Sequence, residues 1–400
     1  MNKDFELKKL SEVCNFQNGF AFKSNTFKDS GTPVIRITNI KNEIIDTSNV
    51  VYINPLDYDK DLSKYEIKNN DLLIAMSGAT TGKIGIYKGN EKLLLNQRVG
   101  NFKPKDKLSK EYLFYFLLTK VEENLAISAG SAQPNLSTLQ INNFMLPLFN
   151  LDIQKQIVEI LDKAFESIEQ AKANIEKNIE NTKELFQSRL NEIFSQKGEG
   201  WEEKTLKEVC TKITDGTHQT PKYFDSGYTF LSSGNVTSGI INWDKIKYID
   251  EKQHLEMQKR VSPQLNDILL AKNGTTGVAA IVDRDIEFDI YVSLALLRAS
   301  DKLEAKYLLH FVNSPIAKKQ FNKRLKGSGV PNLHLQEIRE VIVPYPISKK
   351  EQLKISNYIE LLSMRTKQLE KHYKQKLKNL EELKRSILQK AFSGELLNDS

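Results

Sequence analysis

Two stretches of the chain carry apolar residues at every third or fourth position, and both stretches are long. The first covers residues 153–185 and the second covers residues 355–387. This spacing places the apolar side chains along one face of a helix. Neither Pro nor Gly interrupts the pattern before Gly198 and Gly394. We therefore predict two continuous helices of about 45 residues, each about 65–70 Å long.

A single long helix cannot hide such an apolar face, and two helices of equal length in one chain most simply pack on each other. The chain has to reverse its direction through the segment between them, so the predicted pair is antiparallel. Generic dimerisation through the same apolar faces is the alternative.

The segments outside these helices show a mixed pattern. Short apolar runs at 34–40 and 50–55 alternate with Gly, Asn, Asp and Ser, which predicts strands joined by loops. Residues 110–120 and 304–314 have the spacing of short amphipathic helices, at matching places in the two halves of the chain.

The chain also repeats itself. FELKKLSEVC at 5–14 matches WEEKTLKEVC at 201–210, and DLLIAMSGATTGKIG from Asp71 matches DILLAKNGTTG from Asp267. Further matches follow in the same order, at a period of about 200 residues, which is far too long for a solenoid. The repeat therefore indicates two copies of one domain.

The predicted fold class is an α/β (α+β) tandem duplication with approximate two-fold symmetry, in which two long antiparallel helices separate two globular domains. Its segments are a globular domain at 1–148, a long helix at 149–198, a second globular domain at 199–346 and a second long helix at 347–400.

Composition narrows the class of protein. Of the 400 residues, 40% are hydrophobic and 27% are charged, which is typical of a globular protein. Two cysteines exclude a disulfide scaffold and are too few for a Cys-rich zinc site, and five histidines argue against a His-based metal site. No apolar run approaches the ~20 residues of a membrane span, and the first residues lack the apolar core of a signal peptide, so we expect a cytoplasmic protein. The net charge of +7 predicts local basic loops and no uniformly basic surface.

Four patterns resemble catalytic motifs, but each is incomplete. Residues 78–83 lack the spacing and the Ser or Thr of a phosphate-binding loop. Residues 54–58 lack the second proline of an amino-methyltransferase turn, and the acids at 57–66 lack a counterpart in the second copy. Cys14 and Cys210 follow apolar residues, which is typical of small buried side chains. The sequence therefore predicts a binding or organising protein, with no catalytic or metal-binding residues.

Several loops combine Gly and Ser with polar donors at equivalent places in the two copies. Hydroxyl, backbone amide and Lys groups suit phosphates, whereas Asn, Gln and Arg suit base edges. The side chains differ between the copies, as expected of two modules that read different sequences; solvated turns are the alternative. The residues predicted to contact DNA are Asn18, Lys23, Ser77, Thr80, Thr81, Lys83, Gln97, Arg98, Gln133 and Asn135 in the first copy, and Thr217, His218, Gln219, Lys272, Asn273, Thr275, Thr276, Lys326, Ser328 and Asn332 in the second.

With these motifs in order, the whole chain resembles a specificity subunit of a type I restriction–modification system. The resemblance rests on NGFAFKS followed by GTPVIRITNI, on DGTHQTP, on the pair DLLIAMSGATTGKIG and DILLAKNGTTG, and on QPNLSTLQINNFMLPL, VPNLHLQEIREVIVPYP and SILQKAFSGEL. One departure is DIQKQI at 152–157, which replaces the acidic-Glu-Gln entry usual in the family, whereas KKEQLKI at 349–355 keeps it.

The resemblance implies that each globular domain is a target recognition domain that reads one half of a bipartite site in double-stranded DNA. The helices would set the unread spacer and dock two methyltransferase subunits. Translocase–nuclease (restriction) subunits would join them. The chain itself would bind no cofactor, because S-adenosylmethionine, ATP and Mg²⁺ would be bound by the partner subunits. Two alternatives are the recognition half of a nuclease or methyltransferase enzyme, and a coiled-coil scaffold that does not bind DNA.

Overall fold

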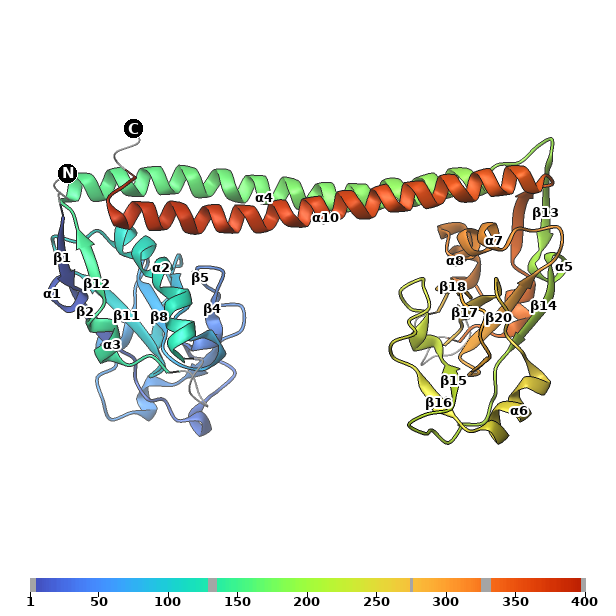
Figure 1. The fold of residues 1–400 in the computed structure, drawn as a ribbon. Coiled ribbons are helices and arrows are strands. Elements are labelled where there is room, and N and C mark those ends of the chain that lie inside the picture. The colour runs from blue at the N-terminus through green and yellow to red at the C-terminus, as the bar shows by residue number, and fades with distance from the viewer. Residues whose placement is uncertain (1–4, 129–134, 274–275, 325–331, 397–400) are drawn as a thin grey trace. The chain divides into compact units, whose positions relative to one another are not determined.

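The computed structural model describes residues 5–128, 135–273, 276–324 and 332–396. Contacts divide the chain into two compact units, residues 1–175 with 375–400 and residues 176–374. Each unit contains one globular domain and one end of each long helix (Figure 1). Within the described residues, no helix is both long enough and apolar enough to cross a membrane.

The first globular domain is built on two main sheets. The larger sheet has the order β2-β11-β8-β9-β5-β4 and the smaller has the order β6-β3-β10-β7, while β1 pairs only with β12. The strands are β1 (Glu6–Lys9), β2 (Cys14–Asn18), β3 (Thr32–Ile35), β4 (Ile40–Lys41), β5 (Ile44–Ile45), β6 (Val51–Ile53), β7 (Glu66–Ile67), β8 (Leu72–Ala75), β9 (Ile84–Ile86), β10 (Leu93–Leu95), β11 (Val99–Pro104) and β12 (Met145–Leu148), and the helices are α1 (Leu10–Val13), α2 (Lys110–Ser128) and α3 (Thr138–Asn142).

The second globular domain repeats this plan. Its sheets have the orders β14-β20-β17-β18 and β16-β15-β19, and β13 pairs with β21. The strands are β13 (Trp201–Thr205), β14 (Cys210–Asp215), β15 (Tyr228–Leu231), β16 (Lys247–Ile249), β17 (Ile268–Ala271), β18 (Ala279–Ile281), β19 (Phe288–Ile290), β20 (Leu294–Ala299) and β21 (Ile342–Pro346), and the helices are α5 (Leu206–Val209), α6 (Glu251–Arg260), α7 (Ala305–Val312), α8 (Pro315–Asn322) and α9 (Leu335–Arg339).

Matching hydrogen bonds show that the two domains are copies of one fold. The buried Tyr112 hydroxyl donates to the carbonyl of Pro147, and the buried Tyr307 hydroxyl donates to the carbonyl of Pro344. The predicted tandem duplication with mixed α and β structure is therefore confirmed.

The predicted strand at 34–40 is wrong in its second half, where β3 ends at Ile35 and a 3₁₀ turn covers Ile37–Asn39. The side chain of the buried Asn39 holds this turn, because it accepts from the amide of Arg36 and donates to the carbonyls of Asp46 and Asn49. Such side-chain bonds compete with the hydrogen bonds of a sheet.

The long helices are α4 (Leu151–Phe194, 44 residues) and α10 (Lys349–Ser393, 45 residues), close to the predicted length. In the first unit the beginning of α4 lies beside the end of α10, where Lys172 forms an ion pair with Glu381. In the second unit the end of α4 shares a core with the beginning of α10, through residues that include Phe194 and Ile359. Opposite ends of the helices meet in each unit, so the predicted antiparallel pairing is confirmed.

The predicted apolar face of α4 is partly wrong. In steps of three or four residues, the predicted face runs from Ile153 through Ile157, Ile160, Ala164 and Ile168 to Leu185. Leu185 is 61% exposed, whereas its neighbour Phe186 packs against the core of the second unit. Leu161 and Phe165 lie outside the predicted face and are buried against the first domain. A helix of 3.6 residues per turn rotates away from a strict heptad, and near its ends it also packs on a globular domain, which widens its buried face.

His310 on α7 provides a test of how the second unit depends on pH. Burial lowers the pKa of this histidine to about 4, with Glu360 opposing and Lys306 reinforcing the shift. As the pH falls below 6.5, the imidazole binds a proton in the unfolded chain but stays neutral in the folded chain. The contribution of His310 to the free energy of unfolding is therefore complete above pH 6.5 and is lost as the pH falls towards 4. When the pH is lowered from 7.5 to 5, we expect this effect of His310 to lower the free energy of unfolding by about 2 kcal/mol.

Urea unfolding at both pH values checks this expectation. The loss should shrink by that amount in His310→Leu and should persist in His334→Leu, which alters an exposed histidine of the same unit. A loss of equal size in the wild type and in His310→Leu would contradict the assignment.

Candidate nucleic-acid interface

A polar hollow of about 380 Å³ lies at one end of the larger sheet in the first domain. It is lined by Met76, Ser77, Gln97, Arg98 and Asn135. Main-chain bonds hold its three segments together, because the amide of Met76 donates to the carbonyl of Arg98 and the amide of Leu136 donates to the carbonyl of Met76. Four of the predicted DNA contacts, Ser77, Gln97, Arg98 and Asn135, are thus brought to one place.

The hollow offers groups suited to reading a base edge. Gln97, Arg98 and Asn135 are exposed. Among the described residues, the Arg98 guanidinium has no hydrogen bond or ion pair, and the buried Oγ of Ser77 has no partner. Arg recognises guanine and Asn or Gln recognises adenine by paired hydrogen bonds, so this arrangement can discriminate bases.

The other described contacts predicted for the first domain do not line this hollow. Asn18 exchanges hydrogen bonds with the hydroxyl of Thr138, and Lys23 and Lys83 are exposed. The Oγ1 of Thr80 donates to the carbonyl of Ile37 over 3.4 Å. Gln133 lies outside the described residues.

Thr81 is fully buried, and its hydroxyl donates to the carbonyl of Gly78 within a tight turn. Gly78 and Gly82 both adopt positive φ angles in this turn, a conformation that favours glycine. The similarity of this segment to a phosphate-binding loop thus reflects the needs of a turn. Thr81 therefore stabilises the turn, and the prediction that its side chain contacts DNA is wrong in this structure because the side chain is fully buried.

The second domain has the same frame with different side chains. Here the amide of Lys272 donates to the carbonyl of Ser293, and the amide of Leu333 donates to the carbonyl of Lys272. Asn273 and Asn332 face each other in an isolated antiparallel bridge, as Ser77 and Asn135 do in the first domain. Within the described part of the chain, the buried Oδ1 atoms of Asn273 and Asn332 have no partner.

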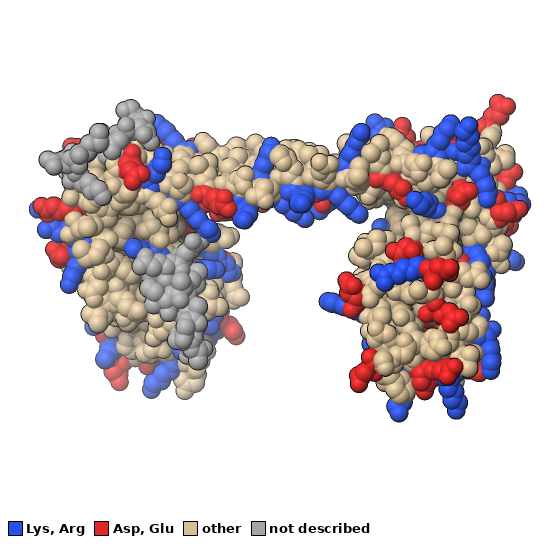
Figure 2. Space-filling view, viewed as in Figure 1, with Lys and Arg blue, Asp and Glu red and all other residues tan. Residues whose placement is uncertain are grey.

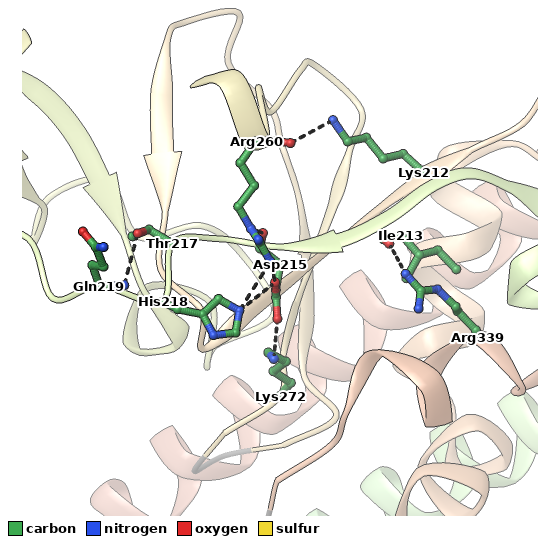
Figure 3. A network of polar contacts seen from close by, with 9 residues as sticks. All are labelled: Lys212, Ile213, Asp215, Thr217, His218, Gln219, Arg260, Lys272 and Arg339. Carbon is green, nitrogen blue, oxygen red and sulfur yellow. Dashed lines mark hydrogen bonds and ion pairs between the residues drawn. The ribbon is translucent and has the colours of Figure 1, made fainter. Parts of the chain in front are cut away.

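A charged cluster surrounds Asp215 at the end of β14 (Figure 3). Its carboxylate accepts from the ammonium of Lys272 at 2.7 Å and from Nη2 of Arg260 at 2.5 Å, and Nε2 of His218 lies 3.3 Å away. Burial opposes ionisation of Asp215, but the hydrogen bonds from Lys272 and Arg260 outweigh it and hold its pKa below the usual value. The carboxylate is therefore ionised at neutral pH.

This cluster corrects the role expected for Lys272. The sequence predicts that this side chain contacts DNA, but it is only 7% exposed and its charge is neutralised by Asp215. Because the ammonium is enclosed, the positive charge available to a ligand belongs to Arg260, whose side chain is 49% exposed.

The remaining predicted contacts of the second domain lie on nearby turns. Thr217 accepts from the amide of Gln219 through its hydroxyl, while His218 and Gln219 are exposed and Thr276 is partly buried. Thr275, Lys326 and Ser328 lie outside the described residues.

The sequence interpretation missed Asp215 and Arg260. A signal for Asp215 was present in the repeat, because Asp215 and Lys272 occupy the positions that Asn18 and Met76 occupy in the first copy. The two positions hold uncharged residues in the first copy and residues of opposite charge in the second. This difference predicts the ion pair between Asp215 and Lys272.

Outside the candidate interface, the surface charges are mixed (Figure 2) and the two cysteines are buried or partly buried. Figure 2 shows acidic and basic side chains interspersed over the visible face of each domain. Burial raises the pKa values of the Cys14 and Cys210 thiols to about 12, which keeps them protonated and unreactive. No group of three or more His, Cys, Asp or Glu residues is placed to hold a metal ion in the described parts of the chain.

Comparisons with known proteins agree with this picture. The family described as Type I restriction modification DNA specificity domain matches residues 2–181 and again residues 198–379. The type I restriction enzyme EcoBI specificity subunit of Escherichia coli is 26% identical, and the match covers 97% of this chain and 85% of that protein. The EcoKI specificity subunit of E. coli K12 is 25% identical, with 97% of this chain and 88% of that protein covered.

Solved structures share the fold. A chain from a study of complex assembly and conformational transition of the type I R-M system matches with a TM-score of 0.77 and 19% identity, over 99% of both chains. The HsdS subunit from Thermoanaerobacter tengcongensis matches with a TM-score of 0.61 and 18% identity, over 98% of this chain and 97% of that one. The resemblance drawn from the sequence motifs is confirmed: the chain belongs to the family of type I restriction modification DNA specificity domains and contains two copies of that domain.

Proposed function

We propose that this chain is the DNA-recognition subunit of a type I restriction–modification complex and that each globular domain reads one half of a bipartite site. One observation carries the proposal: both domains hold the same three segments together by the same main-chain bonds, yet they present different polar side chains there. The same main-chain arrangement with different polar side chains suits two domains that recognise different base sequences.

The partners and cofactors belong to the same proposal. Methyltransferase subunits would dock along the long helices, and restriction subunits would join them, in the cytoplasm. S-adenosylmethionine, ATP and Mg²⁺ would then be bound by those subunits. Along α10, Leu353, Leu361 and Met364 are exposed and fall within one side of the helix, which is a surface that a docked protein could cover. The paired helices would fix the unread spacer between the half-sites.

A map of adenine methylation tests the proposal in cells with and without this gene, with the methyltransferase gene present in both. We expect one bipartite motif to lose its methylation when the gene is deleted, because the enzyme then has no DNA-recognition subunit. If every motif kept its methylation, the chain would not direct that methyltransferase.

Arg98→Ala tests the first domain by itself. The exposed guanidinium in the hollow is expected to contribute about 1–3 kcal/mol to recognition of one base pair, so the variant complex should lose discrimination at one position of one half-site. Selection of bound duplexes from a random pool checks this. Lys88→Ala is the matched control, because Lys88 bonds to Asn70 before β8 begins and the hollow lies where β8 ends. Equal effects of the two substitutions would count against the hollow.

A further inference from the structure

Asp215 makes Arg260 unlike an ordinary surface arginine. The Arg260 side chain donates twice to this residue, from Nη2 to the carboxylate at 2.5 Å and from Nε to the main-chain carbonyl at 3.2 Å. The carboxylate is 4% exposed and is itself held by Lys272, so its position is fixed from within the domain. Two bonds to a fixed group set the plane of the guanidinium as well as its location.

Three N–H groups of Arg260 remain, and two of them form one edge of the guanidinium. A guanidinium has five N–H groups, and the two bonds to Asp215 use Nε and one proton of Nη2. Both protons of Nη1 and the second proton of Nη2 remain. Nε2 of His218 lies 3.4 Å from Nη2 and 3.3 Å from the carboxylate of Asp215, so its role depends on the tautomer of the ring. With the proton on Nε2, the ring donates to Asp215 and leaves the second proton of Nη2 free. The edge between Nη1 and Nη2 therefore offers two parallel N–H groups.

Two parallel N–H groups match the O6 and N7 acceptors of guanine in the major groove. A phosphate can accept the same two N–H groups, so the test below separates a base contact from a phosphate contact. The net charge of Lys272, Arg260 and Asp215 is one positive unit, and the exposed part of it lies on Arg260. The first domain lacks this arrangement, because Asn18 stands at the position of Asp215 and bonds to Thr138.

We infer that Arg260 reads a guanine in the half-site of the second domain and that Asp215 is the positioning residue that aims it. The inference rests on the proposed function, because it requires that the second domain recognises a DNA half-site. Arg260 stands at the end of α6 and next to His218, one of the exposed residues predicted to contact DNA.

The test uses the complete complex with Arg260→Lys and Arg260→Gln, selection of bound duplexes from a random pool, and the methylation map. We expect both variants to lose about 5- to 150-fold of the preference for one G·C pair in one half-site, with the other half-site unchanged. Arg260→Lys keeps the charge but loses the two-pronged edge. Lys259→Gln is the matched control, since this neighbour on α6 is exposed and pairs with Glu256.

The positioning role has its own variant. Asp215→Asn combined with Lys272→Met copies the residues of the first domain and avoids a buried unpaired charge. The double variant should unfold like the wild type and yet lose the same G·C preference, and adding Arg260→Lys should cause no further loss. A double variant that kept the preference would overturn the role of Asp215.

Two other outcomes would overturn the reading of guanine. One is an unchanged motif in Arg260→Lys and Arg260→Gln. The other is a result typical of a phosphate contact. In that case Arg260→Lys would keep the full preference for the G·C pair. Arg260→Gln would lose affinity equally for all DNA sequences, and its binding would depend less on salt concentration. A wild-type complex that selected no motif would instead refute the proposed function itself.

Discussion

Asp215→Asn is expected to lower the free energy of unfolding of the second unit by about 3 kcal/mol. The substitution keeps the size of the side chain but leaves the ammonium of Lys272 buried without a counter-ion, and removing one partner of a buried pair costs about 3–5 kcal/mol. The side chains of both residues are less than a tenth exposed, so water cannot solvate the ammonium in place of the lost carboxylate.

The double variant separates this cost from the loss of a simple contact. Asp215→Asn with Lys272→Met reproduces the neutral pair of the first copy, Asn18 and Met76, and is expected to return to within about 1 kcal/mol of the wild type, because replacing both members of a buried pair is often close to neutral. The two substitutions should therefore be strongly non-additive.

Tryptophan fluorescence during urea unfolding measures both effects. The chain has two tryptophans, Trp201 and Trp243, and both lie in the second unit, so their emission reports on that unit. Asp285→Asn is the control, because it removes an exposed carboxylate from the same domain. A stability of Asp215→Asn equal to that of the control, or a double variant no more stable than Asp215→Asn, would show that the buried pair is not coupled as described.

Gln352→Leu is the second variant with a large expected effect. Gln352 is fully buried near the beginning of α10. Its Oε1 accepts from the amide of Glu304, and its Nε2 donates to the carbonyls of Lys302 and Pro346. Gln154 makes the same three kinds of bond at the beginning of α4, to Ser109, Lys107 and Phe149. One glutamine thus fastens each long helix to its globular domain.

Leucine has nearly the same volume, so the substitution removes the bonds without opening a large cavity. Three main-chain groups would lose their partner, and at about 1 kcal/mol for each we expect a loss of about 3 kcal/mol. Trp201 lies opposite Pro346 in the pairing of β13 with β21, so its fluorescence should detect the loss directly. Gln368→Leu, at an exposed position of the same helix, should change the stability by less than about 0.5 kcal/mol. Equal stability of the two variants would contradict the fastening role.

Local patterns were sufficient for the parts of the fold that depend on neighbouring residues. Long helices follow from a repeated spacing without Pro or Gly, and the duplication follows from two collinear copies of the same motifs. The bounds of α4 and α10 accordingly agree closely with the expected length. The family resemblance rests on the same short motifs and needed no contact between distant residues.

The residues of the candidate interface could be predicted only in part from local sequence patterns. Loops rich in small and polar residues pointed to Gln97, Arg98 and Asn135, which do line one hollow. The same reasoning chose Thr81 and Lys272, which are buried, because composition does not show whether a polar side chain turns outward or inward.

The sequence by itself determined that this protein is a duplicated domain with two long helices, because helix formation and repetition are written in residues close along the chain. The tertiary structure alone decided which charges remain available. Asp215 and Lys272 are 57 positions apart and Asp215 and Arg260 are 45 apart, and folding brings all three together. The buried carboxylate of Asp215 neutralises Lys272, which the sequence predicts as a DNA contact, and it fixes the orientation of Arg260, which the sequence does not single out.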